Sequence, residues 1–166
     1  MIAQPTLKAE EWPELRRAKA SANSGWTYFA NLVKTLHREL GEERTCQVLK
    51  ALMADNARRF VLPGMKGFGL QGRDPWALAS YFKLATGEVL GYKVMLVKES
   101  PRRVLYQVHP PCLWFPDLDI PASFCRAMGE FEREACRLVN PKISVTVNKL
   151  MTAGDPYCEL AFQQEG

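Results

Sequence analysis

The stretch that decides the fold runs from residue 143 to residue 162. It reads Ile143-Ser-Val-Thr-Val-Asn-Lys149, Leu150-Met-Thr-Ala-Gly154-Asp155-Pro156 and Tyr157-Cys158-Glu-Leu-Ala-Phe162. The first part alternates apolar and polar residues, which is typical of a strand with one buried face. Gly154, Asp155 and Pro156 are a strong turn signal, because Gly tolerates positive φ, Asp bonds its own backbone and Pro presets φ. The pattern predicts a closing β-hairpin in which Cys158 shares a face with Leu160 and Phe162.

A second hairpin is predicted further toward the N-terminus. Residues 92–98 and 104–109 are rich in Val, Leu and Tyr, and Pro101 with the two following arginines lies between them. Pro110 and Pro111 end the second strand, because proline cannot donate to a ladder. The two hairpins together predict an antiparallel sheet of about four strands.

Helical periodicity dominates the other segments. Apolar residues recur at helical spacing over 26–40, Gly41 interrupts them, and a second periodic segment covers 42–60, which predicts an N-terminal helical hairpin. Further helices are predicted over 75–84 and, as one long helix between the two β-hairpins, over 122–139. The fold class is therefore α+β, with helices packed on the sheet. Residues 1–25 are expected to be a flexible arm, and 26–163 a single domain.

Composition excludes several classes of protein. The 166 residues are 47% hydrophobic and 24% charged, as in ordinary globular proteins, so one core is expected. The net charge of +4 comes from 22 basic and 18 acidic residues that are interleaved, so no nucleic-acid partner is predicted. No stretch approaches the roughly 20 apolar residues of a membrane helix, so no membrane partner is predicted either.

The five cysteines predict reduced thiols in a cytoplasmic protein. They are widely spaced, odd in number and without a C-x-x-C pair, which disfavours a disulfide framework and a zinc ribbon. No cofactor is therefore expected. Zinc stays open as an alternative, since thiols and an acid from separate segments could bind it at about 2.3 Å per sulfur.

Four motifs carry a resemblance to a known family. They are Leu40-Gly-Glu-Glu43, Val108-His-Pro-Pro-Cys112, Asn140-Pro141 and the terminal stretch from Lys149 to Phe162. Over about residues 26–163 the chain resembles the L-2-amino-thiazoline-4-carboxylic acid (ATC) hydrolase-like family. It is more distantly similar to vinyl-reductase-type small-molecule-binding domains. The first resemblance implies hydrolytic opening of a cyclic amidine, which gives N-carbamoyl-cysteine.

The resemblance also implies site residues. Cys112, Gly154, Asp155 and Cys158 fit places of the family pattern. On the helix before Asn140, the family's Cys falls on Gly129 and its acid on Glu132, unless the alignment slips by a turn and Cys125 fills the thiol position. The chain departs from the family pattern there.

The chemistry of ring opening points to the same residues. Attack on a C=N carbon needs a thiolate or a carboxylate-activated water, together with a group that protonates the departing nitrogen. We therefore expect Cys112 or Cys158 as the nucleophile and Glu132 or Asp155 as the acid and base. A thiol needs activation, and His109 is the nearby histidine. The predicted substrate-binding residues are His109, Trp114, Phe115, Cys125 and Tyr157.

Each of these residues also has a structural interpretation. Glu132 has charged neighbours and fits a solvated helix face, Asp155 forms the turn in any case, and Trp114 and Phe115 fit aromatic anchors of a loop. The sequence thus leaves two hypotheses. One is a hydrolase that opens a small cyclic amidine or related heterocycle at a C–N bond. The other is a non-catalytic small-molecule-binding or sensory domain of the vinyl-reductase type. Both imply a small-molecule partner, and a homodimer stays open.

Overall fold

A four-stranded antiparallel sheet is the frame of the molecule. The computed structural model describes the backbone of residues 15–166 and the side chains from residue 24 onward. The strands are β1 (Lys93–Ser100), β2 (Arg103–His109), β3 (Ile143–Lys149) and β4 (Cys158–Gln164). Their order in the sheet is β1-β2-β4-β3, so the two hairpins lie side by side through the β2·β4 pair. The predicted α+β class and the two hairpins are confirmed.

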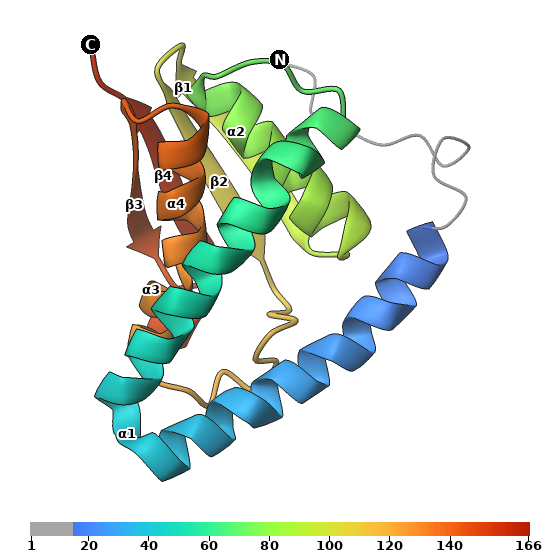
Figure 1. The fold of residues 1–166 in the computed structure, drawn as a ribbon, viewed down its shortest axis with the longest axis vertical. Helices are drawn as coiled ribbons and strands as arrows, with labels where there is room; N and C mark the ends of the chain where they lie inside the picture. Colours follow the sequence, from blue (N-terminus) through green and yellow to red (C-terminus); the bar gives the residue numbers. More distant parts are fainter. Residues whose placement is uncertain (1–14) are drawn as a thin grey trace.

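The helices cover one face of this sheet (Figure 1). Helix α2 (Pro75–Phe82) begins at Asp74, whose carboxylate accepts a 2.8 Å hydrogen bond from the backbone amide of Ala77. Such a cap satisfies an amide that the first helical turn leaves without a partner. The chain then continues into a π-helical segment, η2 (Lys83–Val89), where the sequence predicted only the end of a helix near residue 84.

Helix α1 (Leu15–Gly67) contains the predicted helical hairpin. At Gly41 the backbone leaves the helical region, with φ 75° and ψ 172°, and the chain reverses to form the V seen in Figure 1. Glycine suits this position because residues with a Cβ are strained at such a φ. The first arm begins at Leu15 and the second continues to Gly67, so the helix extends beyond the predicted limits at both ends. Residues 1–14 of the predicted arm lie outside the described residues.

The helix predicted over 122–139 is two helices. Helix α3 (Ala122–Met128) and helix α4 (Glu130–Val139) meet at Gly129, which has a ψ of −2°. The guanidinium of Arg133 donates a 2.8 Å hydrogen bond to the carbonyl of Arg126 at this break. An arginine side chain thus provides a partner for a carbonyl at the end of α3. The prediction of one long helix between the hairpins is wrong in this respect.

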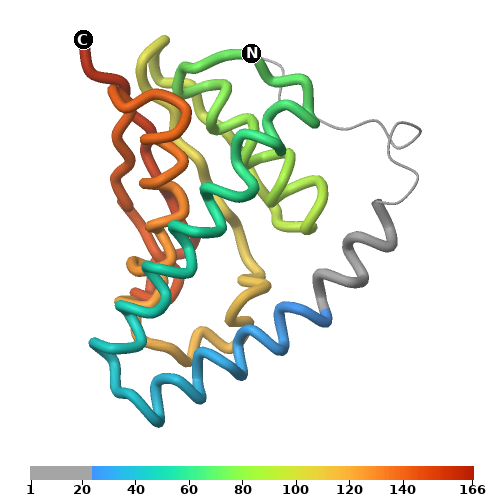
Figure 2. Tube along the Cα trace, in the orientation of Figure 1, coloured from blue at the N-terminus to red at the C-terminus, as the bar shows by residue number. Residues whose placement is uncertain are grey.

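Two apolar clusters hold the layers together. In the larger one, which lies between the sheet and helices α2 and α4, Phe82 stacks on Phe162 with ring centroids 5.5 Å apart. The smaller one fills the V of α1 with Val33, Leu49 and Phe115. Figure 2 shows the loop before α3 lying along the first arm of α1. This loop therefore connects the helical hairpin to the rest of the core.

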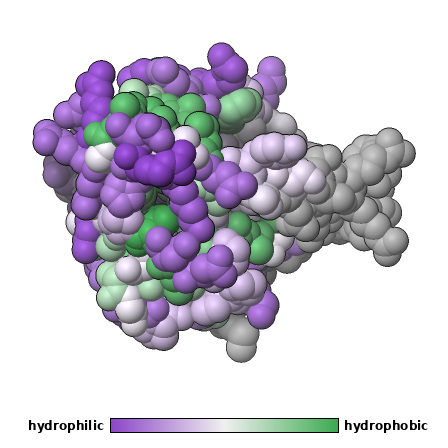
Figure 3. Space-filling model, turned by 90° about the horizontal axis from the view of Figure 1, so that it is seen from below, coloured by the Kyte–Doolittle hydropathy of each residue, from purple (hydrophilic) through white to green (hydrophobic). Residues whose placement is uncertain are grey.

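The surface is mixed in character. Seen from below in Figure 3, hydrophilic side chains dominate, and apolar atoms are visible between them. Among the helices of the described part, none combines the length and the apolar character that crossing a bilayer requires.

Candidate ligand cavity

A cavity of about 310 Å³ lies between the sheet and the helices. This volume is at the lower end of the range of roughly 300–1,000 Å³ that is usual for small-molecule sites. Every layer of the fold contributes to its wall. The lining residues are mostly apolar and aromatic: Met53, Asn56, Tyr81, Phe82, Ala85, Thr86, Leu90, Tyr92, Tyr106, Val108, Cys112, Trp114, Phe115, Cys125, Met128, Gly129, Phe131, Glu132, Val147, Leu150, Met151, Cys158 and Leu160.

The sheet side of the cavity follows from strand alternation. Cys158 lies opposite Val108, and Leu160 lies opposite Tyr106, in the β2·β4 ladder. All four side chains line the cavity, because alternate residues of a strand point to the same face. The predicted common face of Cys158 and Leu160 is confirmed.

The loop between β2 and α3 closes the cavity with aromatic side chains. The backbone amide of Trp114 donates a 3.0 Å hydrogen bond to the hydroxyl of Tyr92. The ring of Trp114 packs edge-on against Trp26 and Phe29 of α1, with centroid distances of 4.3 and 4.5 Å. Phe115 is fully buried. Both predicted aromatic residues therefore anchor the loop and also line the cavity.

Three thiols from separate segments reach the cavity. Cys112 belongs to the loop, Cys125 to α3 and Cys158 to β4. Burial raises the pKa of Cys125 to about 11 and also raises the pKa of Cys158, although the backbone amide of Met151 donates to the Cys158 sulfur at 3.3 Å. Cys125 and Cys158 are therefore protonated near neutral pH and are weak nucleophiles.

Glu132 is the one carboxyl group among the described residues of the cavity wall. It lies on the inward side of α4, beside Phe131 and one turn from Met128. Burial raises its pKa to about 7, because the charged form loses its hydration. The side chain is half-buried by surface area and lines the cavity. The alternative of a solvated helix face does not describe it.

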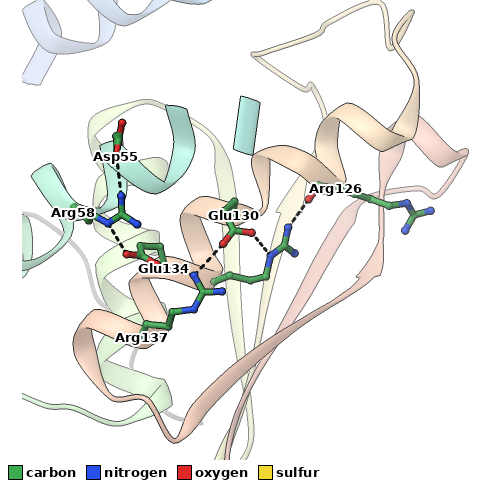
Figure 4. Close-up of polar contacts among 7 residues, drawn as sticks. Asp55, Arg58, Arg126, Glu130, Glu134 and Arg137 are labelled. Atoms are coloured by element: carbon green, nitrogen blue, oxygen red, sulfur yellow. Dashed lines mark hydrogen bonds and ion pairs between the residues drawn. The ribbon is translucent and has the colours of Figure 1, made fainter. Parts of the chain in front are cut away.

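The neighbouring glutamates of α4 have different surroundings (Figure 4). Glu130 is paired with Arg133 and Arg137, whose hydrogen bonds lower its pKa although burial opposes them. Glu134 accepts hydrogen bonds of 2.7 Å from Arg137 and 2.8 Å from Arg58 of α1. The bond from Arg137 is the main reason that the pKa of Glu134 is lowered. These arginines therefore bond to Glu130 and Glu134, and none of them forms an ion pair with Glu132.

Three predicted site residues lie outside the cavity. The Asp155 carboxylate accepts a 2.7 Å hydrogen bond from the backbone amide of Leu150, so it has the turn-forming role that the sequence also allowed. His109 stacks on Tyr157 at 5.1 Å, and the Tyr157 hydroxyl accepts a 2.6 Å hydrogen bond from Lys149. His109 alternates with Val108 along β2, so it belongs to the sheet face away from the cavity. It cannot activate the cavity thiols.

Several polar lining residues were missed in the sequence. Tyr106 alternates with Val104 and Val108 in β2, and that spacing alone could have placed it on the inner face. Asn56 lies three residues after Met53 on α1, on the same side of the helix. Thr86 had no local signal, because it reaches the cavity from the π-helical segment.

The described residues offer little for hydrolysis or metal binding. No Lys, Arg or His is among the described residues that line the cavity. The charge of Arg126, outside the lining, lowers the pKa of Cys125, but burial outweighs it and the thiol is not activated. Within the same part of the chain, no three His, Cys, Asp or Glu side chains are grouped so that they could hold a metal ion. What the arrangement can do is enclose a small, largely apolar molecule.

The fold and the cavity together describe an α+β domain whose helices and sheet enclose an apolar cavity. No family model and no curated protein matches the sequence. Among solved structures, the chain is similar to a crystal structure of a trafficking protein particle complex subunit 3 from Naegleria fowleri, covalently bound to palmitic acid. The TM-score is 0.68 and the identity 15%, over 89% of this chain and 97% of that chain. The likeness concerns the fold.

This comparison corrects the functional expectation. The matched fold is that of a trafficking-complex subunit, which does not fit a hydrolase of cyclic amidines. The cavity agrees with the correction, since the burial of Cys125 and Cys158 disfavours their thiolates and Asp155 and His109 lie elsewhere. The resemblances to ATC hydrolases and to vinyl-reductase-type domains remain predictions that these comparisons do not test.

Proposed function

We propose that this chain is a non-catalytic binding domain that holds one small, largely apolar ligand in the cavity between sheet and helices. The observation that carries the proposal is the wall of this cavity, which is almost entirely apolar and aromatic. Preformed apolar cavities with few polar groups are the usual form of small-molecule sites. The palmitic acid named for the structural neighbour supports an apolar chain as the kind of ligand.

Binding in this proposal is reversible. The raised pKa values of Cys125 and Cys158 leave little thiolate for a covalent bond. Denatured protein should therefore have the mass expected from its sequence, near 18.8 kDa, and organic extraction should release the ligand. An added mass that survives denaturation and is removed by hydroxylamine would show a thioester instead, and would contradict reversible binding.

A bulky substitution in the cavity should abolish binding. Val147 of β3 lines the cavity, whereas Thr146 beside it points to the opposite face and is exposed. We expect Val147→Phe to weaken binding of the neutral dye Nile red by about tenfold or more, because the new ring occupies the site. Dye fluorescence during titration measures this.

Thr146→Phe is the matched control, since it adds the same ring on the same strand. It should change the dye affinity by less than about twofold, because it does not enter the cavity. Equal losses in the two variants, or full binding by Val147→Phe, would mean that the dye binds elsewhere and that the cavity is not the site.

The partner surface that we propose is formed by α1. Tyr28 and Leu32 lie one helical turn apart on its first arm and are 79% and 51% exposed. Exposed apolar side chains at such spacing favour contact with another helix. The structural neighbour is a subunit of a complex, which supports a protein partner. We propose a second copy of this chain as the partner, and the cytoplasmic location that five unpaired thiols favour.

Leu32→Glu should disrupt this dimer. A charge in the centre of an apolar contact is left without its hydration, so we expect the dimer dissociation constant to rise by about thirtyfold or more. Sedimentation equilibrium measures it, with a dimer mass of twice 18.8 kDa. Leu62→Glu on the second arm, where Leu62 is 48% exposed, is the control and should leave the dimer intact. A monomeric wild-type protein would contradict the proposal.

A further inference from the structure

Glu132 is a carboxyl group without a countercharge in the cavity. The described residues provide no side-chain ion pair or hydrogen bond to it, and the hydrogen bond it receives comes from its own backbone amide. Arg133, whose charge lowers the pKa of Glu132 against the effect of burial, donates its hydrogen bonds to Glu130 and to the carbonyl of Arg126. Arg58 and Arg137 are paired with Glu134. An ionised carboxylate in apolar surroundings is costly unless a charge pairs with it. The group therefore has an unused capacity to bind a cation.

The rest of the cavity wall also favours a positively charged ligand. Besides Glu132, the polar side chains of the lining are neutral amide, hydroxyl and thiol groups, and no described lining residue is basic. The rings of Tyr106, Phe82 and Phe131 also line the site. The faces of aromatic rings carry negative potential and attract cations. A bound anion would meet a second negative charge and no positive one.

We propose that the cavity selects apolar ligands that carry a protonated amine, with Glu132 as the counter-ion inside the site. The inference rests on the proposed function, because it names the chemical class of the ligand in that same cavity. A carboxylate-headed chain of the same length is disfavoured, since it would place two like charges together. A neutral chain gains the apolar contacts alone.

The inference is tested with three ligands that differ only in their head group. Decylamine, decanol and decanoate are each titrated against the complex of wild-type protein with Nile red, and displacement of the dye gives their affinities. We expect decylamine to bind about tenfold more tightly than decanol, as for a charge-assisted hydrogen bond. Decanoate is expected to bind most weakly. An affinity of decanoate equal to or above that of decylamine would overturn the inference.

Glu132→Gln keeps the shape of the side chain and removes its charge. It should abolish the preference of the cavity for decylamine over decanol. Glu134→Gln, on the same helix but paired with Arg137 and Arg58, is the matched control and should keep the preference. A preference that persists in Glu132→Gln would assign it to another group and contradict the inference.

The pH dependence of wild-type binding is a second test that needs no variant. Because the pKa of Glu132 is about 7, decylamine affinity should rise from pH 5 to pH 8, while its ammonium stays charged. The other ionisable groups around the site are Tyr81, Tyr92, Tyr106, Cys112, Cys125, Cys158 and, on α4, Arg133 and Cys136. Burial raises the pKa of Tyr81 to about 12, of Cys125 to about 11 and of Cys136 to about 12. A flat profile would contradict the role of Glu132.

The outcomes separate the two proposals. If Nile red and decanol bind but the amine is not preferred, the apolar binding site stands and the inference on the amine fails. If neither the dye nor any of the three chains binds, the proposed function fails, and the inference fails with it.

Discussion

Phe162→Ala should lower the free energy of unfolding by about 3–5 kcal/mol, the usual cost of removing a fully buried phenylalanine. Phe162 is completely buried and stacks on Phe82, with planes only 8° apart. It lies between Val104 of β2 and Val145 of β3 in the ladder, so it is the point where both hairpins meet the helices. Because the interior is close-packed, neighbouring side chains relax only partly into the space that the ring leaves.

Chemical denaturation followed by tryptophan fluorescence measures this loss. Gln163→Ala changes the next residue, on the opposite face of β4, and should cost less than about 1 kcal/mol. Phe162→Leu retains most of the apolar volume and should fall between the two, which keeps the test useful if the alanine variant does not fold. A loss under about 1 kcal/mol in Phe162→Ala would mean that the two layers are not held together at this point.

The sheet could be predicted from the sequence because strand alternation and turn residues are local patterns. Alternation over 143–149 and the turn at Gly154 predicted β3 and β4 to within a few residues, and the prolines at 110 and 111 stopped β2 after His109. The same alternation placed Cys158 toward the helices. These strands can be recognised without knowledge of distant contacts, because apolar residues recur at every second position within each strand.

The helices were less predictable where tertiary contacts decide their limits. Gly129 interrupts the helix predicted over 122–139, and Arg133, which stabilises the break, is also compatible with an unbroken helix. Residues 83–89 form a π-helical segment against β1 and the core. Intrinsic helix propensities do not predict a π-helix at this place. The extension of α1 to Gly67 includes Pro63, which favours a helix end in a local interpretation.

The candidate site was predicted in its composition but not in its chemistry. Cys112, Cys125, Cys158 and Glu132 do converge on one cavity with the predicted aromatic residues Trp114 and Phe115. Nucleophilic catalysis needs an activating cation as well, and the sequence cannot show that His109 lies on the opposite face of the sheet. The family resemblance and the residue types suggested a hydrolase, whereas the burial of Cys125 and Cys158 and the position of His109 support the binding site that we propose.

The three glutamates of α4 illustrate the same limit. Glu130, Glu132 and Glu134 look alike in the sequence, and the charges of the first and third made a solvated position plausible for Glu132. On a helix, however, Glu130 and Glu134 share one face and Glu132 lies about 200° away from each. Arg58, 76 residues before Glu134, pairs with Glu134, so the side of α4 that carries Glu134 lies toward α1. Within α4, the buried residues Ala135 and Val139 lie three and seven positions after Glu132, so helical spacing from these two residues was the signal that could have placed it inside.

Glu132→Gln should stabilise the protein at pH 8 by about 3 kcal/mol, an effect that disappears near pH 4. The pKa of Glu132 is raised to about 7 by burial, against 4.5 for the ordinary group. A raised folded-state pKa means that the stability associated with the proton is fully present below pH 4.5. It is lost as the pH rises to about 7, because the folded state then holds an ionised carboxyl that the unfolded chain would leave in water.

Unfolding of both proteins from pH 4 to pH 8 measures this difference, in the absence of any amine, which would stabilise the ionised carboxyl of the wild type. Glu134→Gln should behave in the opposite way, because the pKa of Glu134 is lowered by its arginine partners. That variant should lose about 1 kcal/mol or more at pH 8 and less at pH 4, where the pairing weakens. Parallel stability curves for wild type and Glu132→Gln would show that Glu132 is hydrated in the folded protein, and the cavity would then be open to water at its acidic wall.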